Sequence, residues 1–265
     1  MTALTVWVEG VGLLGPGLSS WAAALDVIGG ARAHASAPTV LPPPARLPAA
    51  ERRRAGGAVK LALAVADEAV AQAQVDPSTL ATVFTSSSGE GQNCHALCET
   101  LATPMPVVSP TRFTNSVHNA AAGCWHIAVA SRASSTSLCA FDGSFCAGLI
   151  EAATLMRLNG EPVLLVASDS PYPEPLHSAR PLPDHFGLAL MLSPSASARA
   201  IASLTISLSS AAEPDRCADP MLETLRCAVP AARSLPLLTA LAQPRARRSV
   251  VLDYLPGLHV QVDIA

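Results

Sequence analysis

Short apolar segments with strand-like patterns alternate with helical segments along most of this sequence. Leu4, Val6 and Val8 alternate with other residue types, the period of two expected of a half-buried strand. Apolar residues recur at helical spacing in 51–73 and again in 144–158. Further strand candidates are 81–85, 136–141, 163–167 and 188–192. This alternation predicts an α/β fold: a mixed, mostly parallel sheet with helices on both faces.

The pattern weakens beyond Ser193. Strand candidates 204–208, 249–254 and 259–264 surround one helical segment near 220–229. We therefore expect a main domain over 1–195 and a small C-terminal extension, 196–265, that completes or extends the sheet.

Composition excludes several classes of protein. Half of the 265 residues are hydrophobic and 14% are charged, with a net charge of -3. Such a chain carries no global basic field for nucleic acid. No apolar run approaches the roughly 18 to 20 residues needed to cross a bilayer, and 1–17 lacks the basic region of a signal peptide. A cytoplasmic protein is expected.

A metal site is not expected. Cys94 and Cys98, with His95 and His118 nearby, have one spacing that zinc ligands use, but no second pair matches it. A helix over 93–102 would instead place both cysteines on one face. No cofactor is predicted either.

Several landmarks occur in the order of one known family. They are a first strand with a Gly-rich turn (6–17), an Ala-rich helix after three arginines (58–71), a strand with a Ser-Gly loop (83–89), Ser109-Pro110-Thr111, and Asn119-Ala120-Ala121-Ala122-Gly123. Together they resemble the thiolase-fold β-ketoacyl synthases, and more closely their relatives that keep only the N-terminal domain. The resemblance covers about 3–195 and implies a thiolase-like half-fold.

The resemblance also implies where a nucleophile would lie. Active synthases place a cysteine at a strand-to-helix turn about nineteen residues after the glycine that Gly123 matches, and here that position is Asp142. A thiolate there is stabilised by the helix N-terminus and forms a thioester, whereas a carboxylate would form a labile anhydride. Asp142 can alternatively cap the helix, assist decarboxylation or contact a partner. No catalytic residue is therefore assigned.

Full synthases carry two histidines in a second half of the fold, to which His177 and His185 do not correspond. The resemblance thus implies a non-catalytic, chain-length-factor-like subunit, as in aryl polyene biosynthesis. It would form a heterodimer with a cysteine-bearing β-ketoacyl synthase, bound its acyl tunnel, and meet the acyl carrier protein only indirectly.

The same resemblance implies a set of tunnel or interface residues: Phe113, Asn115, His118, Asn119, Cys139 and Phe141. The strand near 136–141 and a helix over 112–130 would supply the interface. The alternative for 112–119 is a structural segment whose polar side chains satisfy a buried turn.

Two other functions remain open from the residues. One is an autonomous acyl-transfer or thioester-hydrolysing enzyme that uses Ser87, Cys139 or Cys146 with a histidine. The other is a homodimer that binds acyl carrier protein.

Overall fold

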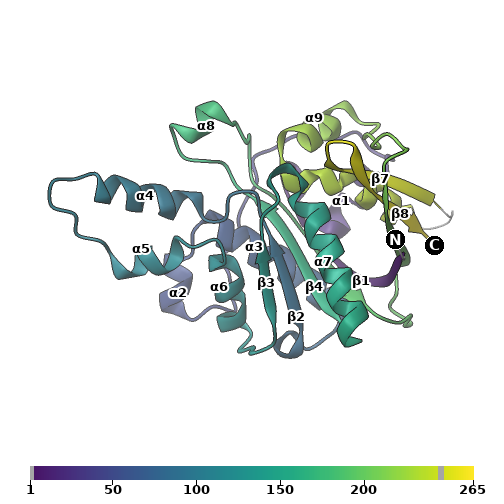
Figure 1. Cartoon of the computed structure of the whole chain (residues 1–265), viewed down its shortest axis with the longest axis horizontal. Coiled ribbons are helices and arrows are strands. Elements are labelled where there is room, and N and C mark those ends of the chain that lie inside the picture. The colour runs from purple at the N-terminus through teal and green to yellow at the C-terminus, as the bar shows by residue number, and fades with distance from the viewer. Residues whose placement is uncertain (1–2, 244–247) are drawn as a thin grey trace.

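The computed structural model describes residues 3–243 and 248–265. Within these residues, eight strands form one sheet in the order β3-β2-β4-β5-β1-β6-β8-β7 (Figure 1). The strands are β1 (Leu4–Leu14), β2 (Ala81–Thr85), β3 (Ser135–Leu138), β4 (Val163–Asp169), β5 (Phe186–Ser193), β6 (Ala202–Ser209), β7 (Arg248–Leu255) and β8 (Leu258–Ile264). The mixed α/β sheet that the sequence predicts is confirmed.

The expected predominance of parallel pairing is wrong. Among the described strands, only β2 with β3 and β2 with β4 pair in parallel, and the other five pairings are antiparallel. A parallel connection needs a long crossover, usually a helix, and helices lie between β2 and β3 and between β3 and β4. The sequence pattern shows the helices but not which strand β1 lies beside.

The helices follow most of the predicted segments. They are α1 (Trp21–Ile28), α2 (Ala49–Arg54), α3 (Gly57–Ala73), α4 (Gly91–Leu101), α5 (Pro110–Asn115), α6 (Ala120–Ala128), α7 (Ser144–Asn159), α8 (Leu176–Ala179), α9 (Pro220–Ala228) and α10 (Leu235–Leu241), with short 3-10 turns η1 (Pro77–Thr79), η2 (Phe141–Gly143) and η3 (Pro230–Ser234). The helix expected over 51–73 is divided into α2 and α3, and the one over 112–130 into α5 and α6.

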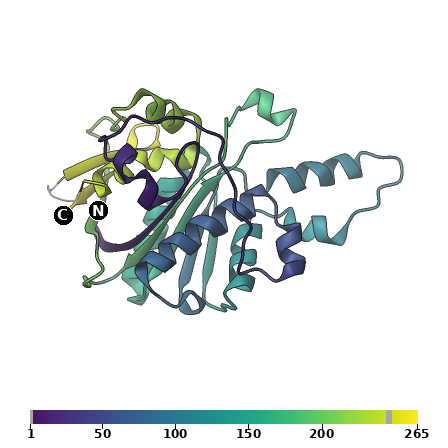
Figure 2. The ribbon, with the colours of Figure 1, turned by 180° about the vertical axis from the view of Figure 1, so that it is seen from behind.

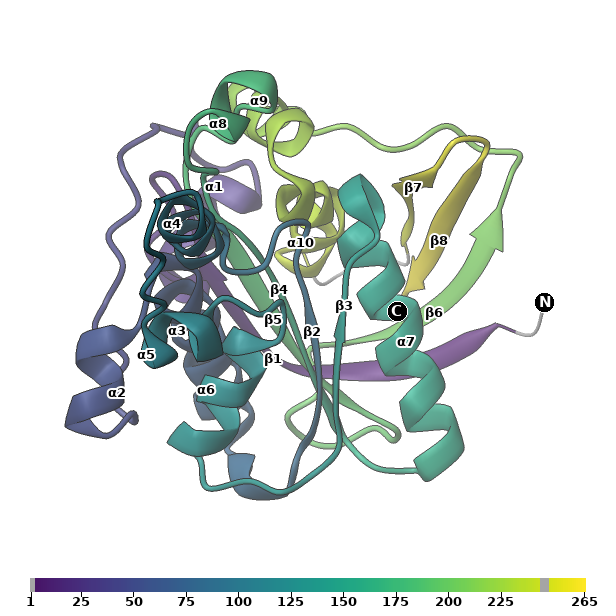
Figure 3. The same cartoon turned by 60° about the vertical axis from the view of Figure 1, so that its left-hand side comes forward.

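Two apolar cores lie on opposite faces of the sheet. Strand β4 shows the division: Val163 and Leu165 belong to the core with α7 and α10, whereas Leu164 and Val166 belong to the core with α3 and α6. All four are buried, because successive strand residues point to opposite faces. Figures 2 and 3 show α3 crossing one face and α7 lying on the other.

Residues 196–265 extend the sheet beyond β1 through β6, β8 and β7. They also contribute η3 and α10 to the core that contains α7. The division at residue 195 stays a prediction.

The two ends of the sheet differ in how their edges are protected. At β7, Asp215 covers the edge: its backbone N–H donates to the Val251 carbonyl (2.8 Å), and its carboxylate accepts from the Val251 N–H (2.7 Å). At β3, no backbone hydrogen bond among the described residues reaches the outer edge. The β3 edge is therefore open to pairing.

A helical arm, 91–117, projects from the β3 end of the molecule and contains α4 and α5 (Figure 1). Large apolar side chains on it are exposed: Leu101, Met105, Val107, Phe113 and Val117. None of the helices in the described ranges has the length and hydropathy to cross a membrane.

Candidate functional site

The turn between β3 and α7 lies where the family resemblance locates a nucleophile. Its 3-10 turn η2 contains Phe141, Asp142 and Gly143. The Ser144 hydroxyl braces the turn, because it accepts from the Ala140 N–H (3.1 Å) and donates to the Phe141 carbonyl (2.7 Å). Phe141 has a φ of 52°, a conformation that a bulky residue adopts only where the surroundings enforce it.

Asp142 is paired with two arginines from distant segments. Arg180 donates to its Oδ1, and Arg233 donates to its Oδ2 at 3.0 Å. Arg233 also donates to Asp253 of β7 at 2.9 Å. The carboxylate of Asp142 therefore neutralises guanidinium groups, and no helix-capping hydrogen bond from it occurs among the described residues.

Arg180 also covers the Phe141 ring. Its guanidinium carbon lies 3.6 Å from the centroid of Phe141 and 5.9 Å from that of Tyr172. These are cation–π distances. The loop between β4 and β5 is thereby attached to the turn.

A second aspartate organises the Ser-rich loop after β2. Asp169 is buried, and its carboxylate accepts from the Ser87 N–H (2.7 Å), the Ser87 hydroxyl (2.7 Å) and the Ala231 N–H (2.8 Å). Burial raises the pKa of Asp169, although these hydrogen bonds act to lower it. Asp169 therefore ties the loop to η3 across the core.

The structure brings some of the predicted tunnel or interface residues together. His118 Nε2 lies 3.1 Å from the Ser86 carbonyl, and the Cys139 thiol donates to the Ser87 carbonyl at 3.4 Å. Both are exposed and meet at the Ser-rich loop. Phe141 follows immediately at the turn.

The other predicted residues lie along the arm and at the start of α6. Phe113 is 59% exposed on α5, Asn115 ends that helix, and Asn119 precedes α6 without capping it through its side chain. No hydrogen bond in the described part of the chain joins their side chains to the loop. Their roles stay predictions.

The candidate nucleophiles lack a base. Ser87 is bonded to Asp169 and lies 3.3 Å from the Tyr172 hydroxyl. Cys146 is buried, which raises the pKa of its thiol, and it donates to the Asp253 carbonyl at 3.5 Å. No hydrogen bond between described residues links Ser87, Cys139 or Cys146 to a histidine, so the autonomous-enzyme alternative has no nucleophile–base pair.

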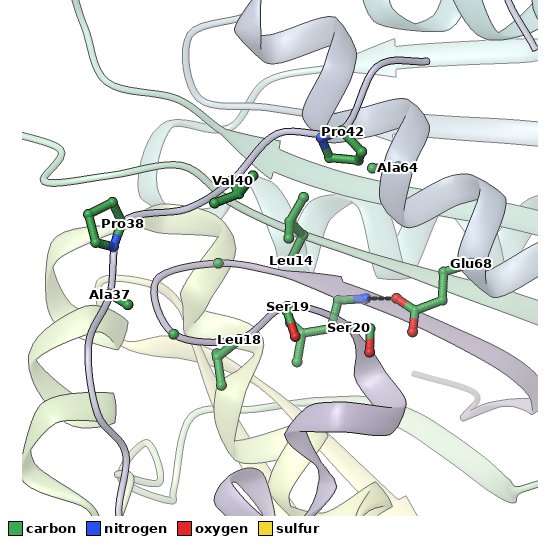
Figure 4. A pocket seen from close by; sticks show the side chains of 13 residues that line it. Leu14, Leu18, Ser19, Ser20, Ala37, Pro38, Val40, Pro42, Ala64 and Glu68 are labelled. Carbon is green, nitrogen blue, oxygen red and sulfur yellow. Dashed lines mark hydrogen bonds between the residues drawn. The ribbon is translucent and has the colours of Figure 1, made fainter. Parts of the chain in front are cut away.

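Two larger cavities flank α3. One, of about 660 Å³, lies under the Pro-rich segment 37–42 and is lined mainly by apolar residues such as Leu14, Leu18 and Val40 (Figure 4). Its acidic residue, Glu68, uses both carboxylate oxygens to accept from the backbone N–H groups of Leu13 and Trp21. The other, of about 260 Å³, lies beside Glu90 and His185.

Sequence reasoning missed Arg180, Arg233 and Asp169. The two arginines are 38 and 91 residues from Asp142, and no local pattern marks them. The charged end of β4, an apolar strand, was the one available signal for Asp169.

Comparison with known proteins follows the same direction. Residues 21–246 match the family model described as "Beta-ketoacyl synthase, N-terminal domain". No curated protein matches the sequence significantly.

Solved structures share the fold over nearly the whole chain. A chain from the complex of ketosynthase ApeO with its chain length factor ApeC, from Xenorhabdus doucetiae, is 25% identical with a TM-score of 0.72, and the match covers 99% of each chain. A chain of the ishigamide ketosynthase/chain length factor is 15% identical with a TM-score of 0.72, covering 98% of this chain and 99% of that one. A chain of the AntDE:AntF complex, described as a type II polyketide synthase acyl-carrier protein with its ketosynthase, is 12% identical with a TM-score of 0.72, and 99% of each chain is covered. Because the family model spans most of its length, this chain belongs to the β-ketoacyl synthase family, through the N-terminal domain.

Proposed function

We propose that this chain is a non-catalytic, chain-length-factor-like subunit that pairs with a cysteine-bearing β-ketoacyl synthase and bounds its acyl chain. The observation that carries the proposal is the turn at 141–143, which holds neither a thiol nor a hydroxyl side chain. Its carboxylate is occupied by Arg180 and Arg233. The acyl group of a thioester intermediate has no acceptor there.

The surface supports a partner at the β3 end. The β3 edge is open, whereas Asp215 covers the opposite edge. The adjoining arm exposes Met105 and Val107, which are 85% and 84% accessible. Exposed apolar side chains beside an unpaired strand are typical of a protein–protein interface.

The similarity to a chain of the ApeO–ApeC complex supports the choice of partner. The proposal assigns to this chain a role in polyketide-type or fatty-acid-type synthesis, with a product of the aryl polyene kind. Phe113, Asn115 and His118 would border the shared tunnel. The partner would carry the cysteine and meet the acyl carrier protein.

The β3 edge offers a sharp test. Thr82 N–H donates to the Ser134 carbonyl and Ser86 N–H to the Leu138 carbonyl, so by the alternation of a parallel ladder Ser137 directs its N–H outward. Ser137→Pro removes that donor and leaves the bonds to β2 in place. Ser137→Ala retains the N–H and is the matched control.

The experiment co-expresses each variant with a full-length, cysteine-bearing ketosynthase and measures co-elution in size-exclusion chromatography and chain elongation. We expect the natural chain and Ser137→Ala to give one complex that elongates, and Ser137→Pro to lose it. Turnover of an acyl thioester by the chain alone, or a complex unaffected by Ser137→Pro, would contradict the proposal.

A further inference from the structure

A buried carboxylate with an unused oxygen lies at the wall of the 260 Å³ cavity. Glu90 is 4% exposed, and its Oε2 has no hydrogen-bond partner among the described residues. An unpaired buried acceptor is costly, and such a group in a folded protein calls for a partner. The missing partner must bring a donor.

The space beside Glu90 is kept open by glycines. A Cβ on Gly56 would lie 2.6 Å from Glu90 Oε1, and one on Gly57 would lie 2.9 Å from His185 Cε1. The His185 ring is held from the other side, because its Nδ1 is 2.9 Å from the Ser170 hydroxyl. The carboxylate and the imidazole are thus fixed against a wall that has no side chains.

Two helix N-termini open into this cavity. Gly57 and Ala58 begin α3, and Gly91 and Gln92 begin α4, and all four line the cavity. Neither helix has a side-chain capping hydrogen bond. The N–H groups of a first helical turn lack acceptors within the helix and carry partial positive charge. They favour an oxyanion ligand.

An oxyanion beside Glu90 needs one shared proton. Two unprotonated oxygens would repel each other, whereas a proton between them makes a strong hydrogen bond. Burial raises the pKa of Glu90 more than the Val59 N–H lowers it. The ionised carboxylate is therefore unfavourable unless a donor reaches Oε2.

We propose that this cavity binds hydrogen phosphate, which donates its own proton to Glu90 Oε2 while its other oxygens accept from the first turns of α3 and α4. The Ser88 and Ser170 hydroxyls, which also line the cavity, supply further donors. The site is separate from the open β3 edge and independent of the proposed pairing.

Titration calorimetry of the full chain with sodium phosphate and with sodium sulfate, near neutral pH and at constant ionic strength, tests this. Phosphate keeps a proton under these conditions and sulfate does not. We expect saturable phosphate binding and sulfate binding at least about tenfold weaker, which corresponds to about 1.4 kcal/mol.

Glu90→Gln replaces the acceptor by an amide N–H that can donate to either anion, and its carbonyl can still accept from Val59. We expect sulfate to bind this variant about tenfold more tightly than it binds the natural chain, with the preference for phosphate lost. Glu161→Gln, at an exposed position, is the matched control and should change neither affinity. Unchanged circular dichroism of Glu90→Gln verifies its fold.

Absence of saturable phosphate binding to the natural chain would overturn the inference. So would equal affinity for the two anions in both the natural chain and Glu90→Gln. Neither outcome bears on co-elution with a ketosynthase, so failure here and failure of the proposed function are distinguishable.

Discussion

Two aspartates of the site have opposite surroundings, and each residue's role follows from them. Asp142 is partly exposed and faces two guanidinium groups. Asp169 is buried, with neutral N–H and O–H donors around it. Asp142 thus balances charge at the turn, whereas Asp169 holds the Ser-rich loop on the core.

The contacts of Asp169 give a prediction at the residue scale. Asp169→Ala leaves the Ser87 and Ala231 N–H groups without acceptors, and each buried unpaired donor costs about 1–3 kcal/mol. We expect a loss of about 3 kcal/mol in the free energy of unfolding, a fall of about 6–12 °C in melting temperature. Calorimetry measures it. Asp263→Ala, at an exposed site, should stay within about 0.5 kcal/mol, and equal effects of the two changes would refute the role given to Asp169.

At the scale of elements, α3 packs directly onto β1. A Cβ on Gly12 would lie 1.9 Å from the Val65 carbonyl oxygen, and one on Gly10 would lie 2.1 Å from the Ala69 carbonyl oxygen. Both neighbours are helix backbone, which cannot turn aside as a side chain can. The glycines therefore set the distance between helix and sheet, and through it the position of the α3 N-terminus beside Glu90.

Gly12→Ala tests this packing. Because α3 would have to move away from the sheet, we expect a loss of about 3 kcal/mol or more, at or beyond the upper end for overpacked sites. Gly123→Ala is the matched control: no atom lies within 4 Å of its added Cβ, and alanine in a helix gains about 0.5–1 kcal/mol. Denaturant unfolding compares the two variants. A Gly12→Ala protein as stable as the natural chain would rule out the direct contact.

For the whole molecule, the sheet has one covered edge and one open edge, and the apolar arm lies beside the open one. Figure 1 shows α4 and α5 projecting away from the sheet. Residues on this arm contribute little to either core. The arm's apolar surface is thus available for association.

Met105→Asp with Val107→Asp tests the arm. Both side chains are exposed, so we expect melting temperature to change by less than about 2 °C, because surface substitutions are usually worth under about 0.5 kcal/mol. Affinity for the ketosynthase partner should fall at least about tenfold, since a desolvated charge opposes burial. Val40→Asp, 80% exposed on another part of the surface, should leave affinity unchanged. Biolayer interferometry measures all three proteins, and an unaffected double variant would remove the arm from the interface.

Local pattern predicted most elements but not all their limits. The Asp76-Pro77 pair caps a short turn as expected, with the Asp76 carboxylate accepting from the Ser78 N–H. The helix expected over 51–73 breaks at Ala55, because Gly56 begins a new helix. Apolar periodicity continues across such a break, so periodicity alone does not reveal it.

The sequence by itself determined the alternating strands and helices and the order of the family landmarks, because hydrophobic period and turn residues act within a few positions of the chain. It also located the turn at Asp142, whose match to the nucleophile position stays a prediction. Only the tertiary structure decided the antiparallel place of β1 between β5 and β6, the two arginines on Asp142, and the unpaired oxygen of Glu90. Each of these depends on groups that approach from distant segments, and a contact of that kind leaves no local pattern in the sequence.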